Sequence, residues 1–480
     1  MRYIIGLDLG TTCVKATIFD ETGNILGFGS AEDRVINLSP GFVEQRAESW
    51  VELSATVIRG ALSAAKIDSQ KVAALSISSQ GITVVPVDKA FRPLRNAISW
   101  LDIRAESESA IIGGAVTSEE LYKITGKPLS PAFTLPKILW LLRNEPQIFE
   151  QTHKLLTPHD YICANFCGTA VTDHTMASGT MLYDITDRRW ADGLMRLFNI
   201  DLGLLPEIRQ AGTPAGKLTK RASELTGLPD STLVITGGQD QKVAAYGANL
   251  QAGMATISFG TAAAMEFLID YAPHQISQFA AFPFIEPGTW VLEACVNTAG
   301  ATINRGRDLF FPDLSLDDMN ALAQSCENSG GVFFYPFLQG AGTPHNADSR
   351  GVFTGLTLGT SRAELVRAIF EGVIMEIYTN LCSARKAGVR VDELCLFGGG
   401  SKSAFICQSL ADITGCAINS FSTPEMGSFG AAKLAAKALG LENFTLDASR
   451  VWEPDQKRRS RHVEQYKLYM KNLRSVFELS

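Results

Sequence analysis

The sequence predicts an α/β protein built from two related halves, on two observations. A strand, a Gly-Thr turn and a second strand occur at residues 3–20 and again at residues 254–268. Between them, the apolar run Leu233–Ile235 meets two glycines and then a stretch suited to begin a helix. The repetition indicates a structural duplication, with two unrelated hairpins as the alternative.

Length and composition limit the class of protein. The chain has 480 residues, 46% of them hydrophobic and 19% charged, which predicts two or three globular domains. The net charge of −7, with a basic run only at 457–461, argues against a nucleic-acid partner. Nine cysteines without a pairing pattern indicate reduced thiols and a cytoplasmic location, and they supply no zinc ligand set. No apolar run approaches the length of a membrane span.

The stretch 232–247 carries the strongest candidate for catalysis. Gly237 and Gly238 permit a sharp turn after the buried strand, and Asp240 follows directly. A carboxylate at a strand-to-helix turn points out of the sheet end, where α/β folds place their chemistry. Asp240 is therefore predicted to be a catalytic base; the alternative is that it caps the following helix.

The N-terminal turn is a candidate phosphate site. Because strand 3–8 continues through a turn into another strand and not a helix, it is no P-loop. Gly10, Thr11 and Thr12 nevertheless offer hydroxyls and backbone N–H groups to a phosphate, and Asp8 can hold Mg²⁺ through waters. Lys15 is a further phosphate candidate, and the alternatives are a surface lysine and an ordinary hairpin.

Polar residues that follow short strands suggest where a hydroxylated ligand binds. Such a ligand needs fixed donors and acceptors beside an aromatic face, and Gln80, Trp100, Asp102 and Arg104 supply them. Alternatively, Asp102 caps a helix and Trp100 belongs to the core. Residues 133–142 form an amphipathic pattern that predicts a helix with Lys137 on its polar side.

The second half offers candidates for the nucleotide. Gly260 and Thr261 form the turn between strands 254–259 and 263–268, which echoes the first turn. Gly399, Gly400 and Ser401 lie between a buried strand and the predicted helix 405–414, where the backbone can approach a phosphate or ribose closely. A plain tight turn is the alternative for these glycines.

Seven motifs in order make the chain resemble the FGGY family of carbohydrate kinases nearly end to end. They are 6–12 (GLDLGTT), 100–104 (WLDIR), 133–140 (FTLPKILW), 172–180 with Thr172-Asp173 and Ala177–Thr180, 237–241 (GGQDQ), 258–261 (SFGT) and 398–403 (GGGSKS) with Gln408 and Ala411-Asp412. The resemblance implies two actin/Hsp70-like (ribonuclease H-like) domains that face each other across a catalytic cleft. We place them at 1–246, mainly sugar-binding, and 247–480, mainly ATP-binding.

The resemblance also implies the reaction and the residue roles. ATP and Mg²⁺ would be used to phosphorylate a sugar hydroxyl, with Asp240 as the general base, Asp240 and Gln241 on the sugar, and Asp8 and Asp240 near the metal. The motifs at 133–140 and 172–180 look most like those of xylulokinases. Gly81-Ile82 stands where xylulokinases carry Met-His, and Gly340–Gly342 replaces the usual Gly-Glu-Arg, so glycerol, gluconate or another polyol stays an alternative acceptor.

Two further hypotheses accompany the kinase. One is an actin-like or Hsp70-like ATPase that uses its cleft as a switch, and the other is a noncatalytic sugar-binding regulator on the same fold. The acceptor-side residues favour a kinase over the first, and the intact Asp8 and Asp240 favour it over the second. The oligomeric state is not readable from the sequence, and a homodimer is one of the states it allows.

Overall fold

The computed structural model describes residues 2–274, 276–343, 346, 348–421, 423 and 425–477. The chain forms two compact units. Unit 1 comprises residues 1–249, 270–291 and 425–446, and unit 2 comprises 250–269, 292–424 and 447–480. The two units therefore do not correspond to a simple division at residue 246, because two later segments pack with the first half.

A six-stranded sheet forms the centre of unit 1. Its order is β14 (Pro214–Lys217), β15 (Leu233–Gln239), β6 (Val72–Ser79), β1 (Tyr3–Leu9), β2 (Cys13–Phe19), β3 (Ile25–Glu32). The strands β1 and β2 form the predicted strand–turn–strand unit and β3 extends it into an antiparallel meander, while β6 runs parallel to both β1 and β15. The buried side chains of these strands, with α1 (Ala47–Ala65) and α6 (Pro158–Cys167), form one hydrophobic core.

A second core of unit 1 lies under shorter elements. It is formed around α4 (Thr134–Asn144) and includes Ile138, Leu182 and Trp190. The remaining strands of this unit are β4 (Ile36–Ser39), β5 (Phe42–Gln45), β7 (Val85–Val87), β8 (Ala97–Ile98), β9 (Lys154–Leu156), β10 (Val171–Asp173), β11 (Tyr183–Asp184), β12 (Arg189–Trp190), β13 (Glu207–Arg209) and β18 (Ala280–Pro283). Its other helices are α2 (Glu106–Ala115), α3 (Ser118–Thr125), α5 (Pro146–Gln151), α7 (His174–Ser178), α8 (Asp192–Leu197), α9 (Lys220–Thr226), α10 (Asp240–Gly247) and α15 (Met426–Ala438), with 3-10 turns η1 (Ser69–Lys71) and η2 (Leu202–Leu204).

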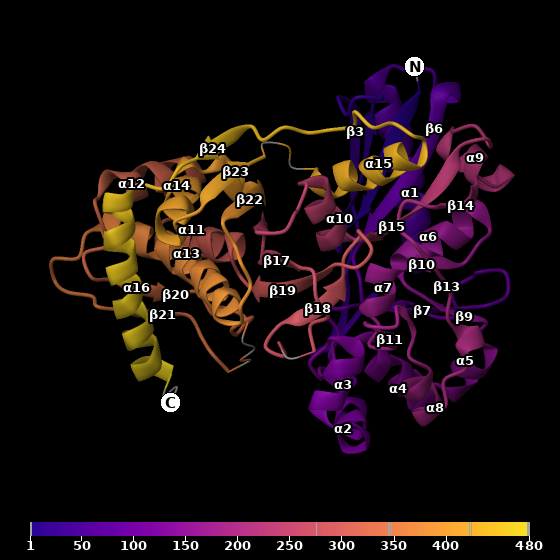
Figure 1. Cartoon of the computed structure of the whole chain (residues 1–480), viewed down its shortest axis with the longest axis horizontal. Coiled ribbons are helices and arrows are strands. Elements are labelled where there is room, and N and C mark those ends of the chain that lie inside the picture. Colours follow the sequence, from indigo (N-terminus) through magenta and orange to yellow (C-terminus); the bar gives the residue numbers. More distant parts are fainter. Residues whose placement is uncertain are drawn as a thin grey trace. The chain divides into compact units, whose positions relative to one another are not determined.

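Helix α15 reaches unit 1 from late in the sequence and packs on β1, β6 and α10 (Figure 1). Glycines make this approach close. A Cβ at Gly6 would lie 1.7 Å from the carbonyl oxygen of Ser428, and one at Gly430 would lie 2.0 Å from that of Val243. The glycines therefore let α15 pack closely on both the sheet and α10.

Unit 2 repeats the strand pattern of unit 1. Strand β16 (Met254–Phe259) pairs antiparallel with β17 (Ala263–Ile269) and parallel with β22 (Glu393–Gly398), which in turn runs parallel to β23 (Ala417–Ser420). The other elements assigned mainly to this unit are β19 (Trp290–Val296), β20 (Phe333–Tyr335), β21 (Val352–Thr354), β24 (Arg450–Trp452), α11 (Gly300–Phe310), α12 (Leu316–Ser325), α13 (Arg362–Lys386), η3 (Gly399–Lys402), α14 (Ala404–Thr414) and α16 (Gln456–Phe477). A hairpin followed by parallel strands thus occurs in both units, as the duplicated motifs predict.

Candidate functional site

Gly237 and Gly238, just before Asp240, have no side chains, so the end of strand β15 packs closely against its neighbours. A Cβ at Gly237 would lie 1.7 Å from the carbonyl oxygen of Ile77, and one at Gly238 would lie 2.8 Å from Oγ1 of Thr175. A side chain at Gly237 would require the backbone of β6 to move, and one at Gly238 would displace the Thr175 side chain. The strand therefore ends rigidly, and Asp240 is the first residue of α10.

Asp240 is held at this turn by its two neighbours. Nε2 of Gln239 donates to Oδ1 of Asp240 at 2.6 Å, and the amide of Gln241 donates to the same oxygen at 2.8 Å. The residue at the N-cap position is Gln239, whose side chain does not cap the helix. Asp240 therefore does not occupy the N-cap position that was the alternative to a catalytic role.

Two pairs of residues that the sequence did not single out as site residues support this turn. Nε2 of His159 accepts the amide of Gly237 at 3.0 Å, so the ring's proton lies on Nδ1, which faces Oδ1 of Asp160 at 3.1 Å. Oγ1 of Thr175 accepts the amide of Gln239 at 2.8 Å and donates to Asp173 at 2.9 Å. The only sequence signal for them was the Thr172–Thr180 motif and the polar start of helix α6.

Gln80 lies beside the Asp240 turn. Its neighbour Gly81 packs closely on the Gln239 side chain, because a Cβ there would be 3.0 Å from Cγ of Gln239. Gln80 is 2% exposed, and its Nε2 donates to Oε1 of Gln45 at 3.1 Å. Among the described residues, neither Oε1 of Gln80 nor Oε1 of Gln239 has a hydrogen-bond partner, although both are buried. The site thus holds two acceptors that a ligand's hydroxyls could satisfy.

Gln45 and Trp100 connect this region to the N-terminal turn. Gln45 donates to the carbonyl of Thr11 at 2.9 Å, and Nε1 of Trp100 donates to Oγ1 of Thr11 at 2.8 Å. The indole is 40% exposed and is not part of the core. Gln45 and Trp100 therefore join Gln80, predicted to contact the sugar, to Thr11, predicted to contact phosphate, and Gln45 carried no sequence signal.

Asp102 and Arg104 lie in a buried ion network and not on an open surface. Nη2 of Arg104 lies 2.7 Å from Oδ2 of Asp102 and 3.0 Å from Oε1 of Glu44, and the guanidinium packs 4.5 Å from the ring centroid of Phe42. The Arg104 and Asp102 side chains are 2% and 0% exposed. Both therefore hold the loop that carries Trp100, and Asp102 does not cap α2, which begins only at Glu106.

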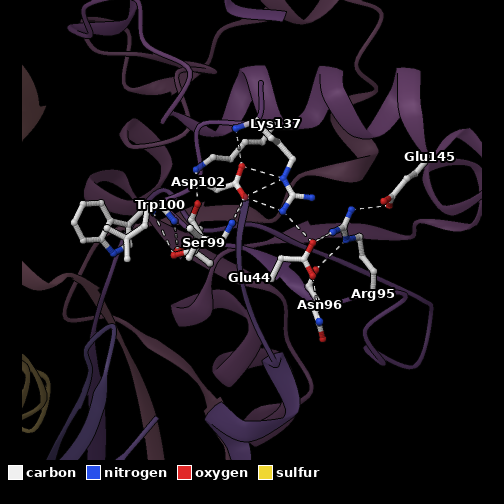
Figure 2. Close-up of polar contacts among 12 residues, drawn as sticks. Glu44, Arg95, Asn96, Ser99, Trp100, Asp102, Lys137 and Glu145 are labelled. Atoms are coloured by element: carbon white, nitrogen blue, oxygen red, sulfur yellow. Dashed lines mark hydrogen bonds and ion pairs between the residues drawn. The ribbon is translucent and has the colours of Figure 1, made fainter. Parts of the chain in front are cut away.

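Lys137 is also part of this region, contrary to the prediction that it lies on a polar helix face. Its Nζ donates to the carbonyl of Ser99 at 2.7 Å, and burial lowers its pKa to about 7 against the opposing effect of Asp102. Figure 2 shows Lys137 and Asp102 close together beside Ser99, and Arg95 between Glu44 and Glu145. The amphipathic pattern failed here because residues 99–104 cover the side of α4 that would otherwise face water.

The N-terminal turn places a carboxylate and a lysine near each other. Oδ1 of Asp8 accepts the hydroxyl of Ser78 at 2.7 Å, and burial raises the pKa of Asp8, while Ser78 and Lys15 lower it. Lys15 pairs with Glu425 at 3.3 Å. Burial lowers the pKa of Lys15, but Glu425 and Asp8 raise it more strongly, so the lysine is charged. Gly10 closes the hairpin through its amide and the carbonyl of Cys13 at 3.0 Å.

The matching turn of unit 2 anchors a helix. The carbonyl of Gly260 accepts the amide of Gly300 at 2.9 Å, and the carbonyl of Thr261 accepts those of Ala299 and Ala301 at 2.9 and 3.0 Å. A Cβ at Gly300 would lie 2.5 Å from the carbonyl oxygen of Gly260. Helix α11 therefore begins directly at the Gly-Thr turn.

A cavity of about 220 Å³ opens beside this turn within unit 2. Gly260, Thr261, Gly399 and Gly400 line it. Its other walls are mostly apolar, with two amides and one hydroxyl: Phe259, Gly300, Ile303, Asn304, Leu316, Asn320, Phe370, Ser403 and Ile406. A Cβ at Gly400 would lie 2.3 Å from the Phe259 ring, so the glycine keeps the wall flat. A flat, mostly apolar slot with a few amide groups suits a purine base.

Ser401 does not line this cavity. Its hydroxyl lies 2.8 Å from the carbonyl oxygens of both Gly398 and Phe421, so it fixes the turn between β22 and α14. The sequence did not indicate the residues of α11, α12 and α13 that complete the cavity, because they are apolar or singly polar and lie far apart along the chain.

Comparison with known proteins identifies the chain. Residues 3–247 match the N-terminal domain model of the FGGY family of carbohydrate kinases, and residues 255–439 match its C-terminal domain model. The chain belongs to this family. FGGY kinases phosphorylate carbohydrates with ATP, and the predicted resemblance and enzyme class are confirmed.

Similar proteins are named for different acceptors. A xylulose kinase of Lactococcus lactis is 27% identical, and the aligned region covers 100% of this chain and 98% of the relative's chain. A glycerol kinase of Deinococcus radiodurans is 32% identical over 95% of this chain and 93% of its own. The structure of a xylulose kinase from Lactobacillus acidophilus superposes with a TM-score of 0.92, at 26% identity, over 100% of this chain and 99% of that one. The predicted α/β fold class is thereby confirmed.

Among the described residues, every helix is too short or too polar to cross a lipid bilayer.

Proposed function

We propose that this FGGY kinase transfers the γ-phosphoryl group of ATP to a hydroxyl of xylulose or a closely related ketose, with Asp240 as the general base. The observation that carries the proposal is the set of groups around Asp240. Two buried amide oxygens without partners, on Gln80 and Gln239, lie beside a rigidly held carboxylate. A buried acceptor without a donor is costly, and a ligand rich in hydroxyls removes that cost.

The chemistry requires one proton transfer and one displacement. Asp240 takes the proton from the sugar hydroxyl while the oxygen of that hydroxyl forms a bond to the γ-phosphorus. The bond between that phosphorus and the β–γ bridging oxygen breaks, and ADP leaves with the electron pair. Trp100 offers an aromatic face to the sugar, and Gln80 and Gln241 are its polar contacts. Asp102 and Arg104 act by holding the Trp100 loop, a more specific role than the direct sugar contact that the sequence suggests.

Mg²⁺ fits the groups near Asp8. Among the described residues, no three acidic, histidine or cysteine side chains gather into a metal site. Magnesium bound to ATP needs only one or two carboxylates, because phosphates and waters supply the other oxygens. Asp8, buried and with a raised pKa, is a carboxylate that a cation would stabilise, and Asp240 is the second candidate. When bound, the ion neutralises charge that develops on the phosphates.

The remaining predicted residues are proposed nucleotide contacts. Gly260, Thr261, Gly399 and Gly400 would contact the adenosine or the phosphates from the unit 2 cavity. Gly10, Thr11, Thr12 and Lys15 would contact phosphate from the N-terminal turn. Ser401 would act through the shape of its turn, because both of its hydroxyl contacts are backbone carbonyls.

The choice of xylulose follows the relatives, and glycerol or gluconate is the alternative acceptor. A cytoplasmic location, a homodimer and the lack of a nucleic-acid partner are parts of the same proposal. An actin-like switch ATPase or a noncatalytic regulator is the competing function. The buried acceptors beside Asp240 favour a kinase over the first, since an ATPase switch needs no hydroxylated ligand.

The test is ADP release measured with a panel of ketoses, polyols and aldonates. Turnover should depend on one of them and be highest with xylulose or a related ketose. Asp240→Asn should lower kcat by about 10³-fold or more, because it removes the base while leaving the side chain's shape. Asp230→Asn, at an exposed position of the same unit, is the matched control. Sugar-independent ATP hydrolysis, or full turnover by Asp240→Asn, would refute the proposal.

A further inference from the structure

A cavity of unit 1 combines several basic side chains with apolar ones. It has a volume of about 490 Å³ and lies between the β11–β12 hairpin and η2, and Asp240 is not among the residues that line it. Lys154, His174, Arg188 and Arg189 contribute its basic side chains, beside Trp190 and a single acid, Glu207. None of these residues belongs to the proposed acceptor or nucleotide sites.

Arg188 is the unusual member of this set. Among the described residues, its Nη1 and Nη2 have no hydrogen-bond partner, although both are buried. A guanidinium taken out of water without an acceptor is strongly unfavourable. The nearby acids are engaged elsewhere. Glu207 pairs with Arg209 at 2.9 Å, and Asp184 accepts the amides of Thr186 and Asp187 at 2.9 and 2.8 Å.

The backbone does not favour an arginine at this position either. Arg188 has φ of 55°, in the left-handed region that favours glycine or asparagine, and its amide closes the hairpin turn on the carbonyl of Asp184 at 2.9 Å. An asparagine would form the same turn with less strain and without a buried charge. The local structure therefore gives no reason for the arginine, which leaves ligand binding as its use.

The groups beside Arg188 in this cavity are a neutral imidazole, a lysine and a second arginine. Nδ1 of His174 lies 2.8 Å from the hydroxyl of Tyr183, and both burial and the charge of Arg188 lower the pKa of His174, to about 4. Lys154 donates to the carbonyl of Leu205 at 2.7 Å, and burial lowers its pKa against the opposing charge of Asp201. Arg189 differs, because Asp187 and Asp192 both pair with it.

We propose that this cavity binds a small oxyanion, with Arg188 as its main partner and Lys154 and His174 beside it. The shared chemistry is a phosphate or carboxylate group, free or carried by a small metabolite. If the Arg188 side chain rotated toward the cavity, its buried and unpaired guanidinium would gain charge-assisted hydrogen bonds to the anion. Binding here is independent of the acceptor site, so it is detectable whether or not the chain phosphorylates a sugar.

The test is calorimetry on the full chain at low ionic strength with inorganic phosphate, a pentose 5-phosphate and acetate as separate probes. At least one probe should bind the wild type, and Arg188→Asn should weaken that binding by about tenfold or more. Arg188→Lys should retain part of it, and Arg189→Gln, the matched control with its charge already paired, should change it by no more than about twofold. The probe bound most tightly distinguishes phosphate, sugar phosphate and carboxylate.

A thermal melt gives a second, independent measurement. In buffer free of these anions, Arg188→Asn should raise the Tm, because it removes an unpaired buried charge and relieves the strain of a positive φ. When a probe is added, it should raise the Tm only of the proteins that retain a cation at position 188. The proposal is overturned if no probe binds the wild type. It is also overturned if Arg188→Asn binds the probe as tightly as the wild type, which would assign the anion to the nucleotide site, or if that variant lowers the Tm without anions.

Discussion

The buried network around Arg104 makes the sharpest prediction about stability. The substitution Arg104→Ala removes ion pairs at 2.7 Å to Asp102 and 3.0 Å to Glu44, and a guanidinium packed 4.9 Å from the Trp140 ring centroid. Glu44 keeps Arg95, so the main uncompensated charge is Asp102, which is 0% exposed. Breaking a buried pair from one side costs about 3–5 kcal/mol. Because Asp102 keeps its backbone donor at Val43, we expect the lower end, about 3 kcal/mol.

Urea denaturation followed by circular dichroism measures this loss in the transition of unit 1. The KM for the acceptor should rise as well, because Trp100 lies on the same loop, while the KM for ATP should change little. Arg92→Ala is the matched control, since Arg92 pairs with Asp88 on the surface and is 79% exposed. Arg104→Met combined with Asp102→Asn should recover part of the loss by removing both charges. A loss for Arg104→Ala no larger than that for Arg92→Ala would show that the network does not hold the loop.

Three other predictions concern close packing and pH. Gly237→Ala should abolish soluble expression or activity, because the new Cβ would lie 1.7 Å from a backbone carbonyl oxygen of β6. The control is Gly193→Ala, where a Cβ would meet no atom within 4 Å and which should be neutral or stabilising; equal yields of the two variants would contradict the prediction. Gly400→Ala should raise the KM for ATP by about tenfold while leaving the acceptor KM unchanged, because its Cβ would meet the Phe259 ring in the cavity; unchanged ATP kinetics would remove this cavity from the nucleotide site. Lys137 has a pKa of about 7 in the folded protein and an ordinary value in the unfolded chain, so the unfolded chain binds more protons between pH 7 and about 10. Stability should therefore rise with pH over that range. Lys137→Met should remove this rise in urea midpoints, and an equal rise in the variant would contradict the burial of the charge.

Much of the fold could be predicted because it depends on short-range patterns. The strand alternation at 3–20 and 254–268, and the glycines at 237–238, are local signals of hairpins and a tight strand end. The order of motifs was enough to identify the family. The same patterns could not assign segments 270–291 and 425–446 to unit 1, because that depends on packing such as the contact of Gly6 with Ser428.

The sequence by itself predicted the candidate site residues Asp8, Gln80, Trp100 and Asp240, each near the end of a strand or at a turn. Only the tertiary structure decided what each of them contacts. It showed that Asp102 and Arg104 form a buried ion network, that Lys137 is covered, and that Gln45 and His159 support the site. The physical reason is that burial and pairing arise between segments distant in the chain, and a charged residue looks the same in sequence whether water or another residue compensates it.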